Sequence, residues 1–70
     1  MELRKLMEDY NEKLARYYKM CKWCETASQS DQLRQEKHIK QVIQNCSNAL
    51  NRIRRYREVT SDEIRKGFEI

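Results

Sequence analysis

The sequence has no proline and a single glycine among its 70 residues, so it is short of the residues that interrupt helices and form tight turns. Runs of β-branched residues are nearly missing too, whereas Lys, Arg, Gln, Asn and Glu are abundant. Such a composition favours helices and disfavours strands. We therefore predict an all-α fold, and a chain of 70 residues is sufficient for one domain only.

Long apolar runs are also missing. No stretch approaches the ~20 apolar residues of a membrane-spanning helix, and the N-terminal region lacks the apolar core of a secretory signal. The chain has one histidine, no glycine-rich phosphate loop and no pair of acids in an apolar setting, which leaves little from which to build an active site. We expect a cytoplasmic, non-enzymatic protein without a cofactor and without membrane contact.

Two apolar heptad stripes are the strongest positive signal in the chain. The first consists of Leu3, Met7, Tyr10, Leu14, Tyr17, Cys21 and Cys24, and the second of Ile39, Ile43, Cys46, Leu50 and Ile53. Their alternating steps of four and three residues place each stripe on one face of a helix. We predict helices over about 2–26 and 31–57, joined by a polar turn over 27–30 and packed as an antiparallel hairpin.

Each apolar face is wider than one stripe. Leu6 and Met20 flank the first stripe, and Val42, Ala49 and Tyr56 flank the second. A domain of this length also has a marginal core, so we expect two hairpins to pair as a homodimeric four-helix bundle. The length and layout resemble those of the Rop family of small RNA-binding helical hairpins; the resemblance concerns architecture and transfers no site residue.

The C-terminal segment contains local signals for a short helix. Thr60 and Glu63 have the spacing of a capping box, and Gly67 lies where a glycine commonly ends a helix. We predict a third helix over about 61–66, which is too short to be stable without docking on the hairpin. The residues expected to dock it are Val59, Ile64, Phe68 and Ile70.

The three cysteines and the histidine formally offer a metal-ligand set. His38 and Cys46 are eight residues apart on one predicted helix, which separates them by about 12 Å. In the predicted hairpin, His38 lies opposite Cys21, while Cys46 lies opposite about Lys13. We therefore interpret the cysteines as structural thiols of the stripes, with a metal site at Cys21, Cys24 and His38, or a redox pair of cysteines, as the alternatives.

Trp23 lies off the first stripe, on the same side of the helix as Arg16 and Lys19, and Lys22 is its neighbour in sequence. An exposed tryptophan flanked by cations is typical of a binding hot spot, either for a protein groove or for stacking on a nucleobase. As alternatives, Trp23 folds over the turn or packs in a dimer interface.

Acidic residues are missing between Lys37 and Arg57. Cations and amides dominate this stretch, and these side chains bond phosphates and base edges. The candidate residues for binding a partner or nucleic acid are Arg16, Lys19, Lys22, Trp23, Arg34, Lys37, His38, Arg52, Arg54, Arg55 and Arg57. A solvated or internally paired basic face is the alternative, because the basic end of the second helix lies beside the acidic start of the first.

These observations lead to two functional hypotheses. In the first, the chain is a small non-enzymatic homodimer that binds and modulates another protein. In the second, it is a nucleic-acid-binding hairpin that uses the basic face of the second helix and the turn end. Salt separates the two, because only phosphate contacts make affinity fall steeply with ionic strength.

Overall fold

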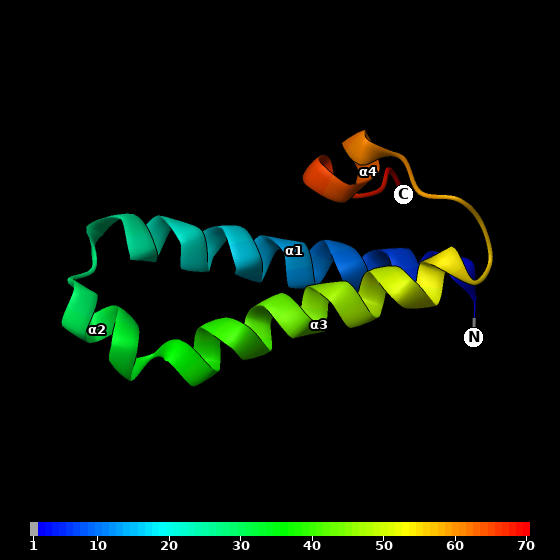
Figure 1. Cartoon of the computed structure of the whole chain (residues 1–70). Coiled ribbons are helices and arrows are strands. Elements are labelled where there is room, and N and C mark those ends of the chain that lie inside the picture. Colours follow the sequence, from blue (N-terminus) through cyan, green and yellow to red (C-terminus); the bar gives the residue numbers. More distant parts are fainter. Residues whose placement is uncertain (1) are drawn as a thin grey trace.

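The computed structural model describes residues 2–70 and shows the all-α helical hairpin that the sequence predicts. Its helices are α1 (Leu3–Thr26), α2 (Gln29–Arg34), α3 (Glu36–Arg54) and α4 (Ser61–Lys66). The two long helices, α1 and α3, lie side by side and antiparallel, with α2 at one end and α4 beside α1 towards the other end (Figure 1). The molecule measures 40 × 19 × 17 Å, and no helix within residues 2–70 has the length and apolarity to cross a bilayer.

The prediction for the second helix was wrong in its bounds and its continuity. It begins at Gln29 and not near residue 31, because the Ser28 side chain caps it by accepting a hydrogen bond from the Asp31 N–H at 3.2 Å. It is interrupted at Gln35, which has φ −97° and ψ 10°, and α2 buries no residue; the Gln32 amide connects α2 to the end of α1 by donating to the Cys24 carbonyl at 2.9 Å. It ends at Arg54, three residues early, where the Ile53 carbonyl accepts hydrogen bonds from the N–H groups of residues 56 and 57.

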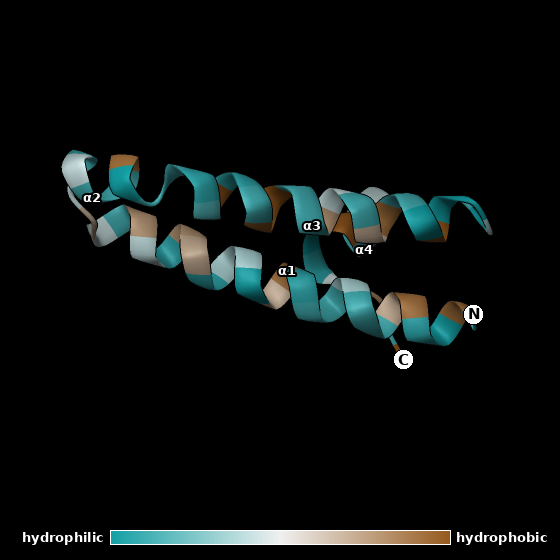
Figure 2. Ribbon diagram, turned by 90° about the horizontal axis from the view of Figure 1, so that it is seen from below, coloured by the Kyte–Doolittle hydropathy of each residue, from teal (hydrophilic) through white to brown (hydrophobic). Residues whose placement is uncertain are grey.

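Burial divides the hairpin into two halves. The buried cluster consists of Leu6, Tyr10, Leu14, Ala49, Leu50, Ile53 and Phe68. We refer to residues 3–14, residues 49–54 and the C-terminal segment, residues 55–70, as the closed half. The remainder, residues 15–48, is the open half; there, α1 has no buried residue after Leu14, and α3 buries only Val42. Hydrophilic residues follow much of both long helices, with the hydrophobic residues in short patches between them (Figure 2).

The face of α3 that is buried differs from the face that carries the predicted stripe. Ile43, predicted to lie in the seam, is 48% exposed, whereas Val42 and Ala49, predicted to flank the stripe, are buried. The helix is rotated so that Val42, Cys46, Ala49 and Ile53 form the row nearest α1, a spacing that also satisfies the helical period. A heptad pattern with apolar residues at adjacent positions permits either rotation, and packing selects between them.

The C-terminal helix has the predicted bounds. Thr60 and Glu63 form both hydrogen bonds of the capping box, and Gly67 follows the helix with φ +89°. Phe68 is buried with its ring 5.6 Å from that of Tyr10 in an edge-to-face arrangement. Val59 and Ile64 also pack on the core, but the prediction for Ile70 was wrong, since it lies past the docked phenylalanine and is 55% exposed.

Candidate functional site

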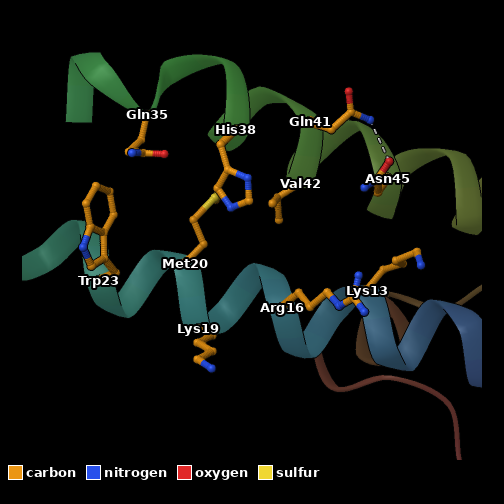
Figure 3. A pocket seen from close by; sticks show the side chains of 10 residues that line it. All are labelled: Lys13, Arg16, Lys19, Met20, Trp23, Gln35, His38, Gln41, Val42 and Asn45. Carbon is orange, nitrogen blue, oxygen red and sulfur yellow. Dashed lines mark hydrogen bonds between the residues drawn. The ribbon is translucent and has the colours of Figure 1, made fainter. Parts of the chain in front are cut away.

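A groove of about 530 Å³ lies between the long helices, in the open half of the hairpin except for Lys13 at its border with the closed half (Figure 3). Its lining residues are Lys13, Arg16, Lys19, Met20 and Trp23 from α1, with Gln35, His38, Gln41, Val42 and Asn45 from the opposite side. We refer to it as the basic groove. Figure 3 shows Trp23 and Met20 reaching from α1 towards α3, and His38 and Val42 reaching back towards α1.

The floor of the basic groove is apolar. Val42 is buried, Met20 is half-buried, and Trp23 at its end is 40% exposed. A methionine side chain is flexible and polarisable, so it adapts to the shape of an incoming apolar group. The floor thus combines an aliphatic residue, an adaptable thioether and an aromatic ring that are only partly covered by the chain's own residues.

The rim of the basic groove is positively charged. Lys13 and Arg16 form ion pairs with Asp9 and Glu12 of their own helix, at 3.4 and 2.7 Å, as their spacing in the sequence predicts. Lys19 has no ion pair among residues 2–70, and Figure 3 shows it pointing away from α3. No acidic residue of the described chain lines the groove. The Arg16–Glu12 pair is exposed and therefore weak, so Arg16 and Lys19, which is unpaired within the described chain, are available to a ligand, whereas Lys13 and Asp9 are half-buried.

Amide side chains complete the rim on α3. Gln41 donates a hydrogen bond to Asn45 Oδ1 at 2.9 Å, and Gln44 makes the equivalent bond to Asn48 further along the helix. An amide has two donor hydrogens and an acceptor oxygen with two lone pairs, so this pairing uses only part of its capacity. The rim can therefore bond a polar backbone or side chain as well as an anion.

The structure brings together four of the predicted binding residues, namely Arg16, Lys19, Trp23 and His38. Lys22, Arg34 and Lys37 are exposed near the turn end but do not line the groove. The predicted surface is therefore concentrated at the turn end, with the basic groove between the helices and three further cations around it.

The four arginines at the end of α3 and just after it lie in the closed half, away from the groove. Arg52 is 4.0 Å from Asp9, and Arg54 and Arg55 are exposed. Arg57 bonds Glu63 and places its guanidinium 5.3 Å from the centre of the Phe68 ring. Arg57 therefore helps to hold the C-terminal segment, and these arginines do not form one surface with the groove.

Sequence reasoning missed the apolar floor of the groove. The heptad stripes leave Met20 and Val42 at their flanks, although Met20 with Trp23 and His38 with Val42 have helical spacing on their respective helices. These pairs form a second, shorter stripe on each helix. The sequence could have revealed the stripes, but it could not show that the two of them border one open groove.

A second, more apolar groove of about 460 Å³ is lined by different faces of the same helices. Its lining residues are Tyr10, Leu14, Tyr17, Tyr18, Ile43, Cys46, Ser47, Leu50, Ile64 and Arg65. We refer to it as the tyrosine groove. α4 borders it, because the Tyr10 hydroxyl donates to the Ile64 carbonyl at 2.6 Å and the Tyr18 hydroxyl donates to the Arg65 carbonyl. Ile43 and Tyr18 each remain 48% exposed there.

The cysteines are free and half-buried. The Cys46 thiol donates to the Lys13 carbonyl at 3.2 Å, which confirms the predicted register of the hairpin at this point. Burial raises the pKa of this thiol, which keeps it protonated and weakly nucleophilic. Within residues 2–70, no three histidine, cysteine or acidic side chains gather in the way a metal ion requires, so Cys21, Cys24 and His38 do not form such a group.

Comparison with protein-family models, curated proteins and solved structures finds no match to this chain. The function of the chain must therefore be inferred from the features of its surface. The basic groove stands out on that surface because it combines an apolar floor, an exposed tryptophan and a rim without acids.

Proposed function

We propose that this chain is a small non-enzymatic helical protein that binds and modulates another protein, receiving a helix of that protein in the basic groove. The observation that carries the proposal is the open apolar floor formed by Met20, Trp23 and Val42. A hairpin that leaves such a floor between two helical ridges matches the groove to which amphipathic helices bind. Trp and Arg at the same place are the residue types most enriched in binding hot spots.

The dimensions of the open half suit such a ligand. Its portion of α1 covers residues 15–26, which corresponds to about 18 Å, or a little over three helical turns. A bound helix of that length presents apolar side chains at i, i+3 or i+4, and i+7 along one face. Two or three of these side chains suffice to cover the floor from Met20 to Trp23.

The chemistry of the groove supports binding and not catalysis. His38 is exposed, and no carboxylate of the described chain lines the groove to orient it as a general base. The cysteine thiol nearest the middle of the hairpin, Cys46, lines the tyrosine groove instead. The basic groove thus has cations and amides but no activated nucleophile.

A second copy of the chain is the partner we propose for the tyrosine groove. Ile43 and Tyr18 border it in a half-exposed state, and Tyr17 and Leu14 extend it along α1. Two such faces can bury one another as the inner layers of a four-helix bundle. The lining of this groove shares no residue with that of the basic groove, so a homodimer joined here leaves both basic grooves free.

Site-specific photocrosslinking tests the main proposal. A benzophenone-bearing amino acid replaces Gln41 on the rim of the groove or, as a matched control, Asn48, an exposed amide outside it. The tagged chains are irradiated in extract of the cells that make the protein, with and without nuclease. We expect position 41, and not position 48, to capture one discrete protein that survives nuclease. Equal capture at both positions, or no protein at position 41, would contradict the proposal.

Nucleic-acid binding is the second candidate, favoured by the acid-free lining of the groove beside Trp23. Phosphates would contact the cations, and a base would stack on the indole ring. This candidate predicts that nuclease removes the captured material and that log affinity falls linearly with log salt concentration. A helix held mainly by the apolar floor would survive nuclease and show a smaller salt dependence.

A further inference from the structure

We infer that the helix received by the basic groove is acidic as well as amphipathic: its apolar side chains cover the floor, and its carboxylates face the rim. This inference depends on the proposed function and specifies the chemistry of the partner. It requires that the groove keep an excess of positive charge after the ion pairs within the chain are counted.

All charged residues that line the groove are cations. Three cations and a histidine contribute to it, and no acid of the described chain does. The two ion pairs of Lys13 and Arg16 use acids one turn earlier on α1, outside the lining, while Lys19 has no such pair within residues 2–70. A helix with carboxylates along its flanks would therefore pass the exposed Arg16 and the unpaired Lys19 of the described chain, which lie one turn apart on α1.

The surroundings of the groove reinforce its charge. Lys22, Arg34 and Lys37 are exposed beyond its turn end. Of the acids in this region, Glu36 is paired with Lys40 at 3.1 Å, while Glu25 and Asp31 are exposed, so the three cations outnumber the two acids that remain. The field at the mouth of the groove is thus positive, and such a field accelerates the approach of an acidic partner and disfavours a basic one.

The apolar floor and the charged rim are positioned for one ligand. Met20 lies one helical turn from Trp23 and one turn from Arg16, and in Figure 3 His38 of α3 lies opposite Met20, with Val42 further along α3 towards Arg16. An apolar anchor between Met20 and Val42 therefore leaves residues one turn away on the bound helix close to Arg16. A neutral helix would fill the floor equally well but would leave the cations without partners, and each exposed charge pair changes affinity by about two- to fivefold.

Selection from a displayed library of helical peptides identifies the sequences that the groove prefers. The peptides have 18 residues with one face randomised, and the library is panned on the wild-type chain. Binders are counter-selected on Met20→Asp, which places a charge on the floor. Ile70→Asp, an exposed site on the C-terminal segment, serves as the matched control. Far-UV circular dichroism verifies that each variant is folded.

We expect the enriched peptides to combine apolar residues at helical spacing with an excess of Asp and Glu, and to bind Ile70→Asp but not Met20→Asp. Groove-dependent peptides without that acidic excess would overturn the acidic partner while leaving the proposed function standing. If no enriched peptide depends on the groove, both the inference and the proposed function are wrong.

Trp23 supplies the quantitative measurement, because it is the only tryptophan of the chain and lines the groove. Titration of its emission with an enriched peptide, and with the same peptide carrying Gln for every Glu and Asn for every Asp, gives the contribution of charge. We expect about a tenfold or greater loss of affinity for the neutral peptide, and about a two- to fivefold loss for Lys19→Gln in the chain. Lys66→Gln on α4 should leave affinity unchanged, and equal affinities for both peptides would overturn the inference.

Discussion

Asn11 and Phe68 hold each other by two hydrogen bonds across 57 positions of sequence. The Asn11 amide donates to the Phe68 carbonyl at 2.9 Å, and its Oδ1 accepts the Phe68 N–H at 2.7 Å. The Asn11 amide thus pairs with both the N–H and the C=O of Phe68, as the backbone of a neighbouring strand would. This relationship holds the buried Phe68 ring against Tyr10 and completes the core of the closed half.

Asn11→Ala should destabilise the protein by about 1–3 kcal/mol, because it leaves both backbone groups of Phe68 without their partner. The change should be measured by urea unfolding, together with amide hydrogen exchange at Phe68, which should become faster. Asn48→Ala, at an exposed amide of α3, is the control and should change stability by less than about 0.5 kcal/mol. Equal stability of Asn11→Ala and the wild type would show that the two bonds do not hold the segment.

Gly67→Ala should also destabilise the closed half, by about 1–3 kcal/mol, for two reasons. The backbone at Gly67 has φ +89°, a conformation that residues with a Cβ rarely adopt, and the added Cβ would lie 2.6 Å from Asn11 Oδ1. In Asn11→Ala that close contact is absent, so the double variant should cost less than the sum of the two single variants. Strict additivity in thermal unfolding would contradict the contact.

The pH dependence of the C-terminal segment should depend on Glu63. Its hydrogen bonds to Arg57 and to Thr60 lower the pKa of this carboxyl from 4.5 to about 2. A lowered pKa in the folded state means that the stabilisation is present above pH 4.5 and is lost as the pH falls towards about 2. Nuclear magnetic resonance of the Gly67 amide should therefore report release of α4 over that range, and Glu63→Gln should lack this acid transition. An identical acid transition in the variant would show that another group controls it.

Ile43 and Ile53 should respond differently to the same substitution. Ile53 is 0% exposed, so Ile53→Asp places a charge in the core of the closed half and should abolish the helical signal in circular dichroism. Ile43 is 48% exposed on the tyrosine groove, so Ile43→Asp should retain the helices while dissociating the proposed dimer. Light scattering measures the mass. An unchanged mass for Ile43→Asp, or a monomeric wild type, would contradict self-association through this groove.

Features encoded by local chemistry could be predicted from the sequence. The bounds of α4 follow from a capping box and a single glycine, both of which act within a few residues. The start of α1 and its end at Thr26 follow from helical periodicity and the polar segment after it. The cross-hairpin contact of Cys46 with Lys13 follows from the position of the turn alone.

Features decided by tertiary packing could not be predicted in this way. The rotation of α3 that buries Val42 and exposes Ile43 depends on which apolar row meets α1 and the C-terminal segment. The break at Gln35 follows a short α2 that buries no residue, and periodicity does not reveal it. The candidate site combines both kinds of information: its cations and Trp23 are visible in the sequence, whereas its open floor appears only when the helices are placed side by side.

The measurement that tests the binding account most directly is an amide chemical-shift map of the 15N-labelled chain with and without the protein captured at position 41. The account predicts that shift changes concentrate on the groove, at Met20, Trp23, His38 and Val42, and that α4 is unaffected. Changes confined to α4 and the tyrosine groove, or spread evenly over the exposed cations, would contradict it.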